Sequence, residues 1–163
     1  MSLGEPIDVH ELAGPAVEGR VVTLIVVHHS ASPDTTTPEE IVAWHRARGF
    51  KDAGYHFLIY RDARGVWVVK ELRAASEPGA HVHVKSRPGL NAHSIGICVA
   101  GDYTRQPLEP VARGHLLATL TWCCRALGLA PSAVYGHREL AATACPGFAM
   151  DPIRDALALA LST

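Results

Sequence analysis

The 163-residue sequence has no excess of basic side chains: 15 Lys and Arg residues stand against 16 Asp and Glu residues, a formal net charge of −1. A nucleic-acid-binding domain normally carries a basic patch or stripe, so nucleic acid is not an expected partner. Long apolar runs are missing as well, since the longest, Val21–Val27, contains Thr23 and is far too short to span a bilayer. We therefore expect neither nucleic-acid binding nor membrane insertion.

The placement of the four cysteines does not suggest disulfides. The four cysteines include an adjacent pair and stand among apolar or small residues: Cys98, Cys123, Cys124 and Cys145. Such a set is a poor disulfide framework, so reduced thiols are predicted. The first residues, Met-Ser-Leu-Gly-Glu-Pro, contain neither a basic nor an apolar segment, so no secretory leader is visible and we expect synthesis in the cytoplasm. A cloning remnant that replaces a native leader would give the same start.

The apolar pattern predicts one α/β domain. Hydrophobic residues make up 48% of the chain and charged residues 19%, which is a globular composition with enough chain for one sizeable core. Residues 1–20 are rich in Gly, Pro and acidic groups and are expected to form an N-terminal arm, with the domain over 21–163. Within it, strands are predicted over 21–28, 55–61, 66–70, 94–100 and 133–136, and helices over 37–49, 108–127 and 151–161. This order is typical of one central mixed sheet flanked by about three helices.

Histidine is unusually frequent for its type, with ten in the chain. His28 and His29 end the first predicted strand, and because side chains alternate across a strand, at most one of them enters a given site. For this pair alone, a structural role satisfied by a backbone carbonyl is the favoured interpretation. Residues 73–93 hold three more histidines in a long irregular stretch, and loops of that length in compact domains are more often functional than idle.

A His and a Cys lie eight residues apart near the C-terminus. His137 and Cys145 stand in a loop bounded by Gly136 and Pro146, and this spacing lets both side chains converge on one metal ion. The other three cysteines fall within predicted strands or helices, where a free cysteine behaves as a small hydrophobe. Spacing alone is a weak metal signature, so a structural role for the pair stays open at this point.

Six motifs follow one another along the chain: Val-Val-His28-His-Ser, Trp44-His45, Gly54-Tyr55-His56-Phe57, Gly79-Ala-His81, Asn91-Ala-His-Ser94, and Gly136-His137 with Thr143-Ala-Cys145-Pro-Gly. Together they resemble the zinc N-acetylmuramoyl-L-alanine amidase family, which includes short phage endolysins and peptidoglycan recognition proteins. The resemblance extends over about residues 20–160. It implies one Zn²⁺ per chain, held by His28, His137 and Cys145.

The resemblance also implies two catalytic side chains, Tyr55 and Thr143. The position of Thr143 is a Lys in some phage enzymes and a Thr in the recognition-protein amidases; a Thr hydroxyl can hydrogen-bond an oxyanion but supplies no charge. Tyr55 begins a predicted strand in which Tyr55, Phe57 and Ile59 are expected to alternate onto one face. A phenol there can donate a hydrogen bond to charge that develops on a carbonyl oxygen.

The remaining candidates concern the substrate. His45, His81 and Asn91 match positions that line the glycopeptide groove in the family, with a plain surface role as the alternative for each. Trp44 is expected in the core or in the groove wall. The partner that the resemblance implies is peptidoglycan or a soluble muropeptide, bound by a monomer.

The activity that the resemblance implies is hydrolysis of the amide bond between N-acetylmuramic acid and L-alanine. Two neutral imidazoles and one thiolate leave zinc an open fourth position for water. The alternative is a module that binds peptidoglycan without cleaving it; non-catalytic relatives usually lose the Cys ligand, so Cys145 favours the amidase. Small amidases of this type resemble endolysins that act on the wall from the periplasm after release, with a recycling enzyme as the alternative.

Overall fold

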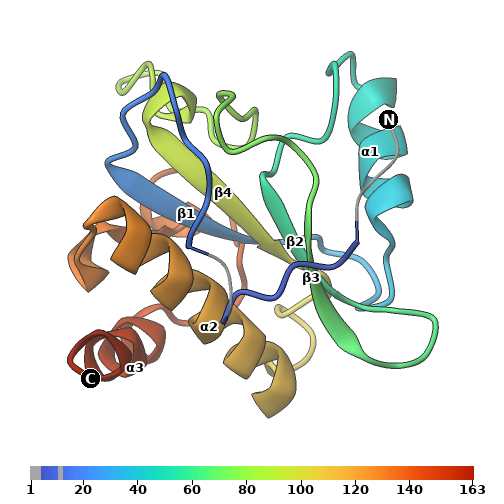
Figure 1. The fold of residues 1–163 in the computed structure, drawn as a ribbon. Coiled ribbons are helices and arrows are strands. Elements are labelled where there is room, and N and C mark those ends of the chain that lie inside the picture. The colour runs from blue at the N-terminus through green and yellow to red at the C-terminus, as the bar shows by residue number, and fades with distance from the viewer. Residues whose placement is uncertain (1–4, 11–12) are drawn as a thin grey trace.

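Five strands form one mixed sheet in the order β3-β2-β4-β1-β5. The computed structural model describes residues 5–10 and 13–163, and Figure 1 shows their arrangement. The strands are β1 (Leu24–His29), β2 (Phe57–Arg61), β3 (Trp67–Glu71), β4 (Ser94–Val99) and β5 (Val134–Gly136). The neighbours β2, β4, β1 and β5 are parallel, whereas β3 forms an antiparallel hairpin with β2. The sheet is therefore mixed, as predicted.

Among the described residues, three α-helices flank the sheet: α1 (Pro38–Ala47), α2 (Pro110–Leu127) and α3 (Asp151–Leu161). In Figure 1, α2 crosses in front of the sheet with α3 beside it, while α1 lies apart from both. A capping box starts α1, because the Thr37 hydroxyl accepts the Glu40 N–H (3.2 Å) while the Glu40 carboxylate accepts the Thr37 N–H (2.8 Å). The predicted α/β architecture is thus confirmed.

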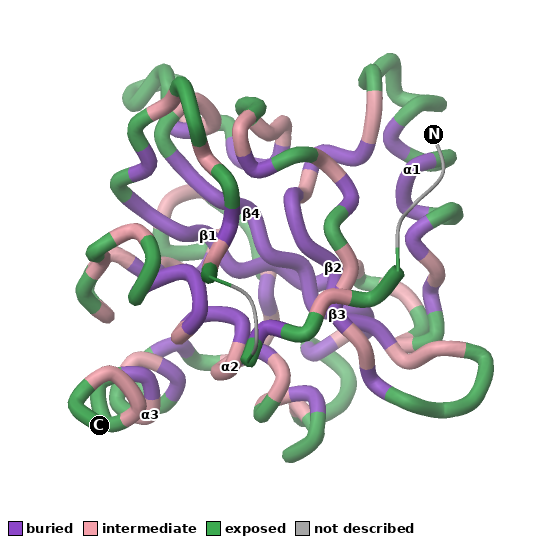
Figure 2. The backbone as a smooth tube through the Cα atoms, in the orientation of Figure 1, coloured by how far each residue is buried: buried purple, intermediate pink, exposed green. Residues whose placement is uncertain are grey.

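Alternate residues of the strands pack on opposite faces of the sheet. Ile25 and Val27 of β1 belong to the large apolar core under α2 and α3. On the other face, Leu58 of β2 packs against Ile41 of α1. Figure 2 shows the strands as buried along most of their length. One face is therefore covered by two helices, and the other carries α1 and, at the end of β1, His28.

Two local expectations are corrected. Trp44 is 44% exposed and belongs neither to the core nor to the wall of the cavity described below. The reason is that Ile41, Val42 and His45 form the buried face of α1, and Trp44 lies to the side of that face. The first apolar run also joins the sheet later than predicted, at Leu24.

The N-terminal residues that the structure describes pack onto the domain. The Ile7 N–H donates to the Val69 carbonyl (2.8 Å), and Val9 is buried in the large core. The Arg20 guanidinium donates to four backbone carbonyls at 2.7–3.2 Å: those of Ala75, Asn91, Ala92 and Ser94. The division into an arm over 1–20 and a domain over 21–163 stays a prediction. No helix in the described ranges has the length and apolar character needed to cross a membrane.

Candidate active site

The end of β1 sends its two histidines to opposite sides of the sheet. On one side, the His29 Nδ1 accepts a hydrogen bond from the Tyr103 N–H (3.2 Å). On the other side, His28 is 1% exposed, and its ring centre lies 4.6 Å from that of His137. As expected from strand alternation, one histidine of the pair meets the other candidate ligands.

A short loop folds back after β5 and brings Cys145 to His137. His137 begins a 3-10 turn (His137–Glu139), and the Arg138 N–H donates to the Cys145 carbonyl (2.7 Å), which closes the loop. The Cys145 Sγ then accepts the N–H of His29 (3.3 Å). The loop is therefore fastened directly to the end of β1, beside His28.

Glu139 ties the same loop to the last helix. Its Oε1 accepts the Gly136 N–H (2.7 Å), and both carboxylate oxygens accept hydrogen bonds from the Arg154 guanidinium of α3 (2.8 Å each). The Arg154 hydrogen bonds hold the pKa of Glu139 below its ordinary value. Glu139 is therefore an ionised hydrogen-bond acceptor that fastens the loop to α3.

The side chains of His28, His137 and Cys145 converge with spacings that suit a metal ion. One ligand atom from each lies within 4.8 Å of the other two, and this is the one such group of His, Cys, Asp and Glu among the residues that the structure describes. The distance from His28 Nδ1 to Cys145 Sγ is 3.7 Å. A tetrahedral zinc with ordinary Zn–N and Zn–S bond lengths holds such a pair about 3.6 Å apart. The arrangement therefore fits zinc.

The protonation states of these groups also suit a metal site. Burial, with the neighbouring His81 and His137 rings, holds the pKa of His28 well below its ordinary value, so its imidazole is neutral. Burial raises the pKa of the Cys145 thiol to about 11. A coordinating divalent cation deprotonates a thiol outright, so Cys145 would bind such a cation as a thiolate.

Tyr55 stands beside the ligand triad. Its ring centre lies 5.0 Å from that of His28, and its hydroxyl hydrogen-bonds to the Cys98 sulfur of β4. Burial raises the pKa of Tyr55 well above its ordinary value, so the phenol remains protonated and can donate.

The face that Tyr55 occupies was predicted wrongly. Tyr55 packs with the α1 cluster that contains Leu58, whereas Phe57 and Ile59 point into the core under α2. The strand begins only at Phe57, and a bend at His56 interrupts the alternation that the sequence pattern assumed.

One cavity of about 800 Å³ collects every predicted site residue in its lining: His28, His45, Tyr55, His81, Asn91, His137, Thr143 and Cys145. Sequence reasoning missed two neighbours of these groups. Arg48 also lines the cavity. The sequence could have indicated this, because Arg48 follows His45 by three residues and so lies on the same helical face. Cys98, expected to be an inert core thiol, supports the Tyr55 hydroxyl, and no sequence signal marked it.

Two of the predicted groups keep a hydrogen-bond donor for a ligand. The His45 Nδ1 accepts the Gly54 N–H (2.6 Å), and burial lowers the pKa of His45 to about 4, so the neutral ring carries its proton on Nε2. The Thr143 Oγ1 accepts the Cys145 N–H (3.2 Å), which leaves its own O–H to donate. Both remain predictions as catalytic or substrate-binding residues.

His81 and Asn91, which were also predicted to contact substrate, use their polar atoms in hydrogen bonds within the protein. The His81 ring lies between His28 (2.9 Å) and the Ser94 hydroxyl (3.0 Å). The Asn91 Oδ1 accepts the N–H groups of His81 (3.0 Å) and Val82 (3.1 Å). Their predicted contacts with substrate are untested, whereas these internal contacts connect both residues to the ligand His28.

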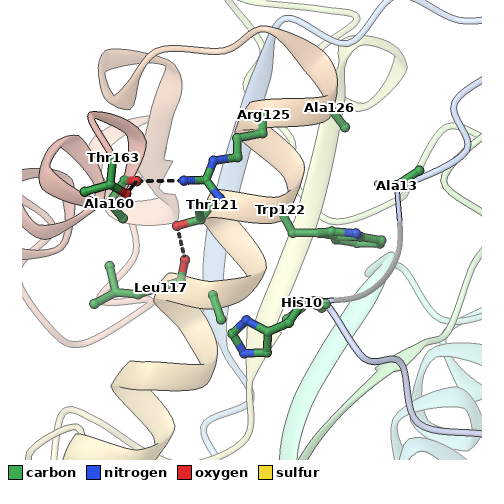
Figure 3. Close-up of a pocket in the computed structure, with 11 residues that line it drawn as sticks. His10, Ala13, Leu117, Thr121, Trp122, Arg125, Ala126, Ala160 and Thr163 are labelled. Carbon is green, nitrogen blue, oxygen red and sulfur yellow. Dashed lines mark hydrogen bonds between the residues drawn. The ribbon is translucent and has the colours of Figure 1, made fainter.

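A second cavity of about 560 Å³ lies on the side of α2 away from this site, near the N-terminal segment and the end of α3. Figure 3 shows two of its polar side chains in internal hydrogen bonds: the Arg125 guanidinium donates to the Ala160 carbonyl (2.9 Å), and the Thr121 hydroxyl donates to the Leu117 carbonyl (2.7 Å). Among the described residues it brings together no cluster of ligating or nucleophilic side chains. The chemistry of the domain is therefore concentrated at the first cavity.

Comparison with known proteins agrees with this geometry. Residues 18–148 match the family model described as N-acetylmuramoyl-L-alanine amidase. The chain is 33% identical to the endolysin of Escherichia phage T7 over 135 residues, which cover 76% of this chain and 80% of that protein. It is 34% identical to peptidoglycan recognition protein 1 of Bos taurus over 136 residues, which cover 77% and 67% of the two chains.

A solved structure gives the same result. The endolysin N-acetylmuramoyl-L-alanine amidase LysCS from Clostridium intestinale URNW superimposes with a TM-score of 0.73 and 26% identity, covering 89% of each chain. The chain belongs to the N-acetylmuramoyl-L-alanine amidase family. The predicted family and the predicted enzyme class, an amidase, are thereby confirmed.

Proposed function

We propose that this chain is a zinc-dependent hydrolase that cleaves the amide bond between N-acetylmuramic acid and L-alanine in peptidoglycan, with one zinc ion per chain. The observation that carries the proposal is the convergence of His28, His137 and Cys145 within 4.8 Å on the lining of a cavity that Tyr55 also lines. Three protein ligands leave a coordination position for catalysis, whereas a structural zinc site normally has four.

The ligand set determines what the metal contributes. A zinc ion held by two imidazoles and a thiolate supplies a Lewis acid that activates water and polarises a substrate carbonyl. His28 and His137 bind through neutral nitrogens, and Cys145 contributes the single negative charge. The loop hydrogen bond from Arg138 to the Cys145 carbonyl holds this ligand in place.

The chain's own donors act on the substrate. The Tyr55 phenol, kept protonated by burial, would turn its hydrogen from the Cys98 sulfur to the oxygen on which negative charge develops as the amide carbonyl is attacked. Thr143 and His45 offer further neutral donors from the cavity wall, which orient the amide and its neighbouring sugar or peptide. Arg48 adds a cation at the same wall.

The same proposal covers where the protein works. We infer that it is made in the cytoplasm and reaches the wall from the periplasmic side after release, in the manner of an endolysin, and that it acts as a monomer. The likeness to the T7 endolysin over 80% of that protein's length supports the first point.

A binding module without hydrolysis is the second candidate. It is favoured by one observation: the chain is 34% identical to a peptidoglycan recognition protein, a class named for recognition. In that case the cavity would hold the muropeptide without turnover, and the zinc site would serve binding or stability.

One experiment separates these functions. Purified sacculi are incubated with zinc-loaded protein, with protein stripped by a chelator, and with stripped protein that has been reloaded. We expect new amino-terminal L-alanine and intact muramic acid, identified by mass, in the first and third samples. If the zinc-loaded protein co-sediments with sacculi and releases no new termini, the binding module replaces the amidase.

A further inference from the structure

The ring of His81 lies behind His28 in a buried relay of three side chains. The His28 Nε2 and the His81 Nδ1 are 2.9 Å apart, and the His81 Nε2 lies 3.0 Å from the Ser94 Oγ. All three residues are buried, with exposures of 1%, 8% and 0%. The relay therefore has little exchange with solvent, and each ring nitrogen faces a defined partner.

A metal bound at the His28 Nδ1 would select one tautomer for each ring of the relay. The His28 nitrogen that faces Cys145 is Nδ1, so a ligand at that nitrogen requires the ring proton to sit on Nε2. That N–H can donate only if the His81 Nδ1 carries no proton. The His81 proton then resides on Nε2 and is donated to the Ser94 hydroxyl oxygen. With a metal at the His28 Nδ1, this is the arrangement of protons that satisfies both contacts; without a metal, the reversed arrangement, in which Ser94 donates to His81 and His81 to His28, satisfies them as well.

β4 is shaped to receive the His81 ring. Ser94 and Gly96 are two residues apart on the strand, so they share a face. A Cβ at Gly96 would stand 2.6 Å from two carbon atoms of the His81 ring, a distance that no packed side chain tolerates. Ser94 therefore supplies the hydrogen-bond acceptor, and the missing side chain of Gly96 leaves a slot that the His81 ring fills.

The backbone that carries His81 is clamped as well. The Asn91 carboxamide accepts the N–H groups of His81 and Val82 and donates to the Val82 carbonyl (2.8 Å). The Arg20 guanidinium in turn holds the carbonyls of Asn91 (3.2 Å) and Ser94 (2.7 Å). The loop over 73–93 thus presents His81 to His28 from a fixed position.

We propose that His81 is a positioning residue of the metal site, which holds the His28 ring in the orientation and tautomer that present Nδ1 to zinc, with Ser94 as its anchor. This inference rests on the proposed zinc site and adds a function to residues otherwise expected to contact substrate. Most ligating histidines donate to a carboxylate or a carbonyl. Here the acceptor is a neutral imidazole, whose own proton must be held by Ser94.

The test compares zinc affinity across matched variants, measured by competition with a chromogenic chelator on the full chain. His81→Leu fills the slot without an acceptor and should bind zinc about 10- to 100-fold more weakly, the usual effect of losing a partner of a ligand. His81→Asn keeps an acceptor oxygen near the position of Nδ1 and should recover most of this loss. His83→Leu, an exposed histidine two residues away, should leave zinc affinity unchanged.

Two further measurements keep the outcome decisive. Cobalt substituted for zinc should show an altered absorption spectrum in His81→Leu and a nearly native one in His81→Asn, a difference that lost packing alone does not produce. Should His81→Leu fail to fold, Ser94→Ala, which removes only the anchor, should still weaken zinc severalfold. Native zinc affinity in both His81→Leu and Ser94→Ala would overturn the inference. If the wild type itself binds no zinc, the proposed function fails instead.

Discussion

On the face of the sheet that meets α2 and α3, β1 and β4 bury the branched apolar side chains Ile25, Val27, Ile95, Ile97 and Val99, with His29 at the end of β1 as the polar exception. On the opposite face, the same two strands contribute His28, Ser94, Gly96 and Cys98, each beside a specific partner. Apolar residues of the first set can be replaced by other apolar side chains of similar volume at a small cost in stability. Residues of the second set cannot be replaced in this way, because each of them provides a specific hydrogen-bond donor or acceptor or, at Gly96, the space for a neighbouring ring. The two faces should therefore respond differently to substitution, in stability on one side and in metal binding and turnover on the other.

The largest difference is expected between two cysteines. Cys145→Ala removes a proposed zinc ligand, so the variant should lose most of its zinc and its hydrolysis should fall to background. Cys123→Ala, in the core under α2, should keep one zinc per chain and lose only a little stability. Metal analysis after desalting, with muropeptide cleavage on the same samples, checks both. Full zinc retention in Cys145→Ala would remove it from the ligand set.

Two tyrosines give the next contrast. Tyr55→Phe keeps the ring but removes a donor aimed at transition-state charge, which should slow cleavage about 100- to 1,000-fold, or roughly 3–4 kcal/mol, with little change in muropeptide binding. Tyr103→Phe removes the hydroxyl that donates to the Ala100 carbonyl (2.6 Å) on the other face, and should cost about 1 kcal/mol of stability without slowing turnover. Single-turnover kinetics and calorimetric binding measure each. An unchanged rate in Tyr55→Phe would exclude it from the mechanism.

The core under α2 should show the reverse pattern. Leu120 is fully buried, and Leu120→Ala should lower the free energy of unfolding by about 3 kcal/mol through lost burial and a cavity. Zinc affinity should stay native, because no partner of the triad is touched. Urea unfolding at saturating zinc, beside chelator competition, checks this. A weakened zinc site in this variant would mean that the two faces are coupled.

The smallest effect concerns pH and His56, on the site side of the sheet. Burial lowers the pKa of His56 to about 4, with its Nδ1 accepting the Gly96 N–H (3.0 Å) and its Nε2 donating to the Glu77 carbonyl (2.8 Å). Between this value and the unfolded pKa near 6.5, the unfolded chain binds more protons, so stability falls as the pH falls through that window. His56 should therefore account for about 2 kcal/mol of the stability lost between pH 7.5 and pH 5.

His56→Gln tests this contribution. The zinc-free variant should show a shallower decline in unfolding free energy with falling pH than the zinc-free wild type, whatever its absolute stability. Parallel pH profiles for the two proteins would assign the acid sensitivity to other histidines.

The comparison of faces also explains how far sequence reasoning reached. The core under α2 follows from apolar periodicity, because Leu116, Leu120, Cys123 and Leu127 repeat at helical spacing; the first three are buried, and Leu127 packs partly buried against the same core. The face of Tyr55 was missed because one bend at His56 reverses the alternation, and nothing in the sequence marks that bend. The internal bonds of His81 and Asn91 depend on how the loop over 73–93 folds back onto β4. Such long-range contacts have no periodic signature, so only a resemblance could single these residues out.

Arg20 has a practical consequence for anyone who trims or transplants this domain. Its single guanidinium joins carbonyls from three stretches of chain, at residues 75, 91–92 and 94. A fragment that starts at residue 21 leaves those carbonyls without their common donor and loosens the loop that carries His81. A minimal catalytic module, or a chimera that borrows this cavity, therefore has to begin upstream of Arg20, even though the first strand starts only at Leu24.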